Sequence, residues 1–262
     1  MAESGLSRVR VALPALASVI ALSLTYVIFV RTAAGQAIDA SAFGGGEIIR
    51  DWLTLLLPWL RTGIVLVLAT IALAAGVIGL RHDRGRELTV ALVLVLLSVA
   101  LARMLRNILG RPYLGDYAYS INTLPSTHAA AAASLVVAIV TIWPRRQRGI
   151  RPTLIAAGIV TAAGYASVLS FAHRPSDVVA AILLVGALAA LLLPLTQSRY
   201  NAKKFAGGLF WPIAVSILLL IVWFLTLLPF FSDIRFTLGP LIEIFAAALW
   251  LMVLATRRSA ES

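Results

Sequence analysis

Cysteine is absent from this 262-residue sequence, and charged residues are scarce at 13%. Without cysteine, the chain has no disulfides, no thiolate metal ligands and no cysteine nucleophile. A soluble domain carries about 25% charged residues and is about half apolar. Here 61% of the residues are hydrophobic and the mean hydropathy is +0.96, so the composition indicates an integral membrane protein.

Acidic residues are also few: 11, against 22 lysines and arginines, for a net charge of +11. Such a balance is typical of nucleic-acid-binding proteins. Here, however, the basic residues form short clusters between apolar runs, where they act as signals of membrane topology. We therefore expect no nucleic-acid partner.

Eight apolar runs are close to the roughly 20 residues that a membrane-spanning helix needs. They are residues 11–30, 62–80, 88–109, 125–144, 152–172, 178–195, 209–231 and 236–256. A ninth run, 52–60, is too short to span and contains Pro58, so we predict that it lies along the outer membrane interface. The sequence predicts an all-α, polytopic membrane helix bundle of about eight transmembrane helices, with residues 1–262 as one integral membrane domain.

The basic clusters alternate with the apolar runs in a way that orients the chain. With both termini in the cytoplasm, every inner loop carries a cluster, as the positive-inside rule requires. This orientation predicts a multi-pass protein of the cell membrane. The first run is long for the apolar core of a cleaved signal peptide, although cleavage there stays an alternative.

Three polar stretches fall at predicted outer ends of the spans: RNILGRP (106–112), LPSTHA (124–129) and AHRPSD (172–177). The chain has three histidines, and His128 and His173 both lie in these stretches, whereas His82 lies in a basic inner loop. Ionisable groups at membrane depth are costly and are functional by default. The three stretches are therefore predicted to form one extracytoplasmic site.

The residue types in these stretches suit phosphate chemistry. Arg111 offers a planar, permanently charged fork for phosphate oxygens. Ser126 and Thr127 open a predicted helix, whose free backbone N–H groups form an anion site, and His128 lies in its first turn. His173 and Asp177 are four residues apart, so on a helix the carboxylate can hold the imidazole in one tautomer.

Together the stretches resemble the type 2 phosphatidic acid phosphatase superfamily, whose fold is shared with vanadium haloperoxidases. The family pattern is K-x-x-x-x-x-x-R-P, then P-S-G-H, then S-R-x-x-x-x-x-H-x-x-x-D. This chain supplies R-P at Arg111-Pro112, then PSTH and HRPSD, in the family's order. The resemblance covers about residues 88–195 and implies a six-helix catalytic core.

The resemblance implies a metal-independent phosphatase that needs no cofactor. His173 would be the nucleophile that forms a phosphohistidine, Asp177 would orient it, and His128 would be the general acid. Arg111, Ser126 and the backbone at Thr127 would hold the phosphoryl oxygens.

The chain departs from the family pattern at three positions. Met104 stands where the family has lysine, Thr127 where it has glycine, and Ser167 where it has a second arginine. The candidates to supply the missing positive charge are Arg103 or Arg106 in place of the lysine, and Arg174 in place of the second arginine.

The predicted function is a membrane lipid phosphatase that acts on a polyprenyl phosphate, a polyprenyl diphosphate or a phosphatidic acid-like lipid. A lipid phosphotransferase and a non-catalytic accessory protein that binds lipid phosphate stay open as alternatives. A proton-coupled transporter is less favoured, because the polar residues lie at one face of the membrane and not at its midplane. A zinc hydrolase that uses the same histidines is less favoured, because the flanking arginine suits phosphate better than a metal ion. The pattern assigns no role to Glu243 and leaves a protein partner unknown.

Overall fold

The computed structural model describes residues 2–42, 53–116, 120–143, 150–196 and 232–258. Over these ranges the chain forms helices and no strand. The helices are α1 (Ala2–Arg31), α2 (Ala33–Ser41), α3 (Leu53–Arg81), α4 (Gly85–Ile108), α5 (Thr127–Ile142), α6 (Ile150–Leu169), α7 (Pro175–Leu192), the 3-10 helix η3 (Leu193–Thr196) and α10 (Ser232–Arg258). Six of them are long and apolar enough to cross a membrane, which confirms the predicted all-α polytopic bundle.

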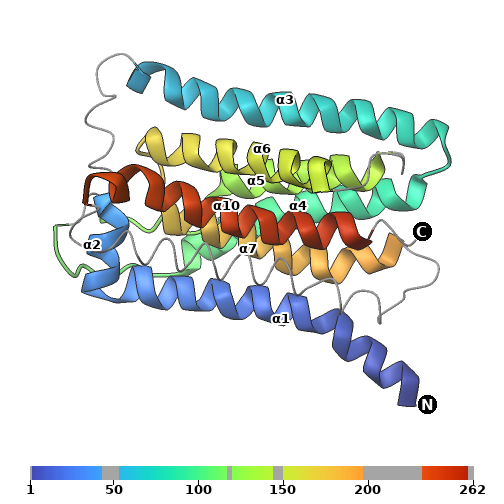
Figure 1. The fold of residues 1–262 in the computed structure, drawn as a ribbon, viewed down its shortest axis with the longest axis horizontal. Coiled ribbons are helices and arrows are strands. Elements are labelled where there is room, and N and C mark those ends of the chain that lie inside the picture. The colour runs from blue at the N-terminus through green and yellow to red at the C-terminus, as the bar shows by residue number, and fades with distance from the viewer. Residues whose placement is uncertain (1, 43–52, 117–119, 144–149, 197–231, 259–262) are drawn as a thin grey trace.

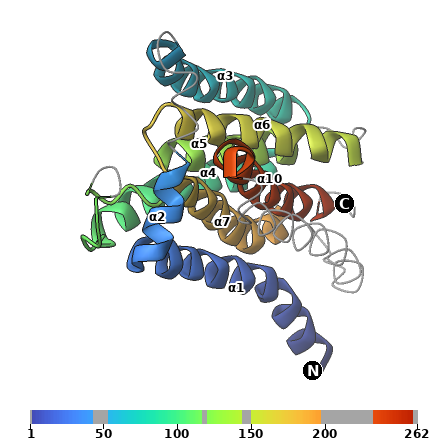
Figure 2. The ribbon, with the colours of Figure 1, turned by 60° about the vertical axis from the view of Figure 1, so that its left-hand side comes forward.

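The long helices run along a common direction, and one short helix crosses it. Figure 1 shows α1 and α3 on opposite sides of the bundle, with α5, α6, α7 and α10 between them. The start of α1 and the end of α10 lie at one end, and α2 lies across the other end (Figures 1 and 2). Both termini therefore face the same way, as the arginine clusters predict, and the cytoplasmic assignment of that end stays a prediction.

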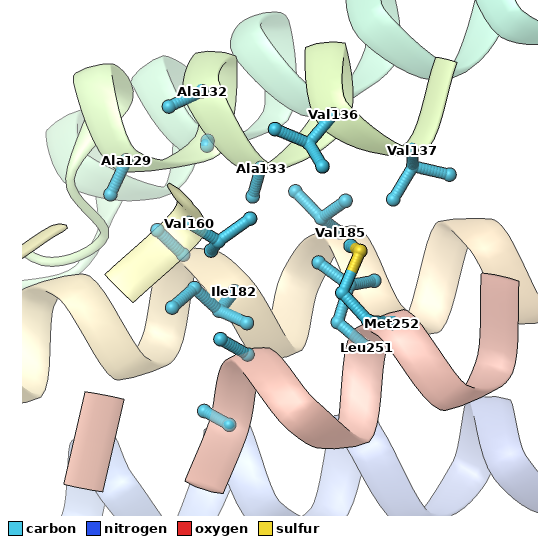
Figure 3. Close-up of a cluster of buried hydrophobic side chains, with 14 of the residues drawn as sticks. Ala129, Ala132, Ala133, Val136, Val137, Val160, Ile182, Val185, Leu251 and Met252 are labelled. Atoms are coloured by element: carbon cyan, nitrogen blue, oxygen red, sulfur yellow. The ribbon is translucent and has the colours of Figure 1, made fainter. Parts of the chain in front are cut away.

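Small and β-branched residues fill the centre of the bundle (Figure 3). Alanines and valines of α5 meet Val160 of α6, Ile182 and Val185 of α7, and Met252 of α10 in one buried cluster. Gly164 of α6 permits a close approach to α7, since a Cβ there would lie 2.5 Å from Val178 Cγ1. Small residues let helices pack closely where no water drives them together.

The outer helices present apolar side chains to their surroundings. Only 22% of the apolar stretch of α1, and of that of α3, is buried in the bundle, against 67% for α7 and for α10. Leu66 and Leu73 on α3 are 63% and 73% exposed. A soluble protein rarely leaves so continuous an apolar surface in water, so these faces fit contact with lipid.

Helix α5 is shorter than the predicted run 125–144. Its 16 residues rise about 24 Å, less than the ~30 Å hydrocarbon core of a bilayer. Because α3, α4, α6, α7 and α10 all pack around it, α5 is enclosed by protein and its length need not match the bilayer. At its end, Arg84 Nη1 donates to the carbonyls of Ile142 and, at 2.8 Å, Trp143.

The prediction of a separate interfacial segment at 52–60 is wrong for its described part. Residues from Leu53 onward form the beginning of α3, which continues through Pro58 to Arg81. Proline removes only one backbone hydrogen bond, and membrane helices tolerate this loss. The predicted seventh run, 209–231, lies outside the described residues.

Candidate active site

The turn between α6 and α7 places His173 at the edge of the bundle's interior. The His173 backbone N–H donates to the Ser167 carbonyl at 3.2 Å, and the Phe171 N–H donates to the Val168 carbonyl at 2.9 Å. Phe171 has φ of 55°, a left-handed conformation that costs a non-glycine residue about 1–2 kcal/mol. His173 is buried, with 3% of its surface exposed. These bonds fix the backbone from which the imidazole projects.

Asp177 is the centre of the polar contacts around His173. Its Oδ2 accepts from Thr123 Oγ1 at 2.5 Å and from the Arg174 backbone N–H at 3.0 Å. The same oxygen lies 3.5 Å from His173 Nδ1. This last distance exceeds that of a usual hydrogen bond, and catalytic contacts commonly shorten when substrate binds.

The structure corrects one assumption about this pair. His173 is not on a helix, because α7 begins at Pro175 with Arg174 as its N-cap. Asp177 is the third helical residue, and its carboxylate folds back over the helix start in a capping-box arrangement. The carboxylate therefore meets the imidazole through the helix cap and not along one helix face. It also lies at the helix start, where the dipole favours an anion.

The start of α5 is joined directly to the start of α7. The Ser126 backbone N–H donates to the Asp177 carbonyl at 2.9 Å. Ser126 is fully buried, and its Oγ caps α5 by accepting from the Ala129 N–H at 3.3 Å. Thr127 and His128 follow as the first two residues of α5, and both are half-buried. Thr123, just before PSTH, and Asp177 of HRPSD are 54 residues apart in sequence and are hydrogen-bonded to each other. The PSTH and HRPSD stretches thus form one cluster, as predicted.

Three groups lie close enough to His128 for their charges to act on it: Arg61, His173 and Arg106. Arg106 is half-buried near the end of α4, whereas Arg103, one turn earlier, is exposed. The two histidines and Arg106 therefore come together as predicted.

Arg61 is the member of this group that the sequence patterns do not identify. It lies in α3, on the same helical face as Leu57, Ile64 and Leu68, at spacings of four, three and seven residues respectively. Leu57 and Leu68 are buried, and Ile64 packs against the core cluster that includes the first residues of α5. Arg61 thus faces inward, and its Nε is buried with no hydrogen-bond partner among the residues described. In the sequence, the signal for Arg61 is its helical spacing from the apolar residues Leu57, Ile64 and Leu68.

The segment between α4 and α5 holds Arg111 against the end of the bundle. The side-chain amide of Asn122 donates to the carbonyls of Leu109 at 2.8 Å and Arg106 at 3.2 Å. Tyr26 Oη of α1 donates to the Gly110 carbonyl at 2.7 Å. Arg111 is half-buried in this braced segment.

The structure shows the burial and the contacts of the positions that depart from the family pattern. Met104 is 47% exposed on α4. Ser167 is fully buried, and its Oγ donates to the Ala163 carbonyl at 3.3 Å. Arg174 is also fully buried, and its charge acts on Asp39 of α2. Among the described residues, no group of three His, Asp or Glu side chains is placed to hold a metal ion.

Comparison with known families found a match for the part of the chain that holds the three polar stretches. Residues 87–202 match the family model of the PAP2 superfamily. The chain carries a PAP2 superfamily domain over these residues. The matched segment begins in α4, includes all three polar stretches and continues beyond η3, so α1, α2, α3 and α10 lie outside it.

Searches of curated proteins and of solved structures found no match to the chain. The PAP2 superfamily consists in general of phosphatases, and the apolar helices make this member a multi-pass membrane protein.

Proposed function

We propose that this PAP2 protein is a lipid phosphatase that removes a phosphoryl group by way of a phosphohistidine on His173. The observation that carries the proposal is the arrangement of His173 beside Asp177 Oδ2, with His128 close by under the charges of Arg61 and Arg106. One imidazole with a carboxylate partner suits a nucleophile, and a second imidazole beside it suits an acid.

The chemistry proceeds in two steps. With its proton on Nδ1, facing Asp177, His173 attacks phosphorus through Nε2. The P–N bond forms as the P–O bond to the lipid breaks, and His128 donates a proton to the leaving oxygen. Water then attacks the phosphohistidine, His128 takes up the water proton, and phosphate leaves as the P–N bond breaks. Each proton returns to its donor at the end of the cycle, so no further reactant is needed.

Positive groups bind the phosphoryl oxygens, which carry the negative charge throughout. We assign this role to Arg111, Arg106 and Arg61, together with the backbone N–H groups at Thr127 in the first turn of α5. Arg61 supplies from α3 the positive charge that is missing at Ser167. Ser126 contributes by capping α5 and so fixing that turn. A direct contact between Arg174 and phosphate stays a prediction.

The position of the cluster favours a lipid substrate. It lies at the end of a bundle whose outer helices present apolar faces, so a phosphate at the headgroup level reaches it while the acyl or prenyl chain stays in the bilayer. A polyprenyl phosphate, a polyprenyl diphosphate and a phosphatidic acid-like lipid all have this form. We place this end on the extracytoplasmic face, from the arginine clusters at the opposite end.

Phosphate release by the purified full-length protein tests the proposal. We expect release from at least one of these lipids in detergent, and we expect the rate to be unchanged by EDTA, because the proposed nucleophile and acid are side chains. Loss of activity with EDTA, restored by added Zn²⁺, would instead support a metal hydrolase. Binding of the lipids without release, by folded protein, would support the accessory-protein alternative.

Replacement of Arg61 tests the phosphate-binding set. We expect Arg61→Ala to lower kcat/KM by about 10²-fold, as removal of one transition-state donor does. Arg61→Lys is expected to recover part of this loss, because it restores charge without the guanidinium fork. Arg103→Ala is the matched control, since Arg103 is an exposed arginine on the neighbouring helix. Equal kcat/KM for Arg61→Ala and Arg103→Ala would show that Arg61 does not bind the phosphoryl group.

A further inference from the structure

Helix α2 lies outside the matched family segment, yet it crosses the end of the bundle where the polar stretches meet (Figures 1 and 2). It starts two residues after α1 ends, with Thr32 Oγ1 accepting from the Gly35 N–H at 3.0 Å. A Cβ at Gly35 would lie 1.9 Å from the Ile28 carbonyl oxygen, so only glycine allows so tight a turn. The turn directs α2 across the bundle and over the candidate active site.

Two buried side chains of α2 each contact one of the motif segments. Gln36 Nε2 donates to the Pro112 carbonyl at 3.0 Å, next to Arg111, and to the Val30 carbonyl at 2.8 Å. Asp39 accepts two hydrogen bonds from Ser176: the backbone N–H to Oδ1 at 3.0 Å and Oγ to Oδ2 at 2.6 Å. Asp39 is 3% exposed and Ser176 is 2% exposed.

A buried carboxylate is expensive unless its partners offset the loss of water. Burial raises the pKa of Asp39 to about 7, and the charge of Asp177 acts in the same direction. The two hydrogen bonds from Ser176 and the charge of Arg174 oppose this rise. Glu243 on α10 also lies within electrostatic range of Asp39. These are the charged groups that face Asp39 from α7 and α10.

We propose that Asp39 is a positioning residue for the phosphatase reaction, holding the first turn of α7 through Ser176. That turn carries Asp177, which orients His173, so a shift at Ser176 moves the nucleophile. Gln36 gives the same helix a hold on the Arg111 segment, so α2 sets the spacing between the phosphate-binding and nucleophilic parts of the site. This inference rests on the proposed function.

The double hydrogen bond from Ser176 matches the ionised form of Asp39, in which both oxygens only accept. When Asp39 is protonated, one oxygen becomes a donor and the Ser176 hydroxyl must turn to accept from it. Since the folded-state pKa is about 7, Asp39 is neutral below that pH and ionised above it. We therefore expect kcat to rise as pH increases through about 7.

Asp39→Asn tests the proposal, because asparagine keeps the size and one acceptor oxygen but has no charge. We expect kcat to fall about 10- to 100-fold, KM to change less than threefold, and the rise of kcat near pH 7 to disappear. Ser176→Ala, which keeps the backbone N–H bond to Asp39, is expected to give a smaller loss in the same direction. Asp116→Asn is the control, since Asp116 is an exposed carboxylate whose Oδ1 accepts from Tyr113 Oη.

The pH profile of Glu243→Gln separates Asp39 from the other titrating groups. The rise of kcat is expected to be kept in Glu243→Gln, which leaves Asp39 and its two hydrogen bonds from Ser176 in place, and to be lost in Asp39→Asn. Because all variants are assayed on one substrate, ionisation of the substrate affects every pH profile in the same way. A profile of Asp39→Asn that equals the wild-type profile, with kcat equal to that of Asp116→Asn, would overturn the proposal.

Binding of orthovanadate distinguishes failure of this inference from failure of the proposed function. Vanadate mimics the geometry of phosphoryl transfer and binds a positioned site more tightly than a displaced one. If the wild-type protein binds vanadate but releases no phosphate from any lipid, the proposed function fails. In that case we still expect Asp39→Asn to weaken vanadate binding at least 10-fold, with Asp116→Asn unchanged. Equal vanadate affinity in the two variants would show that α2 does not position the site.

Discussion

Replacement of His173 by alanine is expected to abolish phosphate release, lowering kcat by at least about 10³- to 10⁴-fold. The variant has no atom that attacks phosphorus, so the P–N intermediate cannot form. Rapid acid-free denaturation of the wild-type protein during turnover of a ³²P-labelled lipid phosphate should trap label on the protein. The label should be stable to alkali and released by acid, as expected of a phosphoramidate, and it should be absent from His173→Ala.

His128→Ala is the informative comparison for this experiment. Without its acid, the leaving oxygen departs slowly, yet His173 remains able to attack a substrate with a good leaving group. We therefore expect His128→Ala to keep measurable labelling with a p-nitrophenyl phosphate ester and to lose most of its turnover of a lipid phosphate. Labelling of His173→Ala at the wild-type level would place the nucleophile elsewhere.

The sequence predicted the parts of this molecule that follow from local pattern. Long apolar runs can satisfy their backbone groups only as helices in a membrane, so the existence of α1, α4, α6, α7 and α10 followed from composition. The clustering of His128 with His173 followed from the alternation of spans. It places every second loop at the same end of the bundle and needs no knowledge of packing.

Features that depend on packing between distant segments could not be predicted. The length of α5 is one example, because its 16 residues suffice only where five other helices enclose it. Pro58 is another, since the sequence shows a helix-breaking residue but not the neighbours that accommodate it inside α3.

The site residues that escaped the sequence analysis share one property: they lie outside the motif-bearing segment. Asp39 belongs to the nine-residue helix α2, which follows the long helix α1. An aspartate after a long apolar helix is typical of a solvated loop, and only its contact with Ser176 shows otherwise. Arg61 fits equally well as an interfacial arginine at a helix end. Contacts over 137 residues of sequence, as between Asp39 and Ser176, have no local signature.

Asp177→Asn is expected to lower kcat by about 10³-fold or more while leaving the protein folded. The amide can present its NH₂ group to His173 Nδ1, which then has to accept, so the proton moves to Nε2 and the nucleophilic lone pair is lost. An equivalent change of tautomer in another hydrolase costs about 10⁴-fold in kcat. The Thr123 hydroxyl can turn to accept from this NH₂ group, whereas the Arg174 N–H loses its acceptor, so the start of α7 is also expected to loosen.

Thr123→Val separates loss of the tautomer from mere loosening of the carboxylate. It removes one hydrogen bond to Asp177 Oδ2 but keeps the charge and the Nδ1 contact, so we expect a loss of only about 10-fold in kcat. The imidazole ¹⁵N chemical shifts of His173 should report the tautomer directly: Nδ1–H in the wild type and in Thr123→Val, Nε2–H in Asp177→Asn. If Asp177→Asn and Thr123→Val reduce kcat equally and leave the same tautomer, Asp177 serves only to cap α7 and the nucleophile is activated by another group.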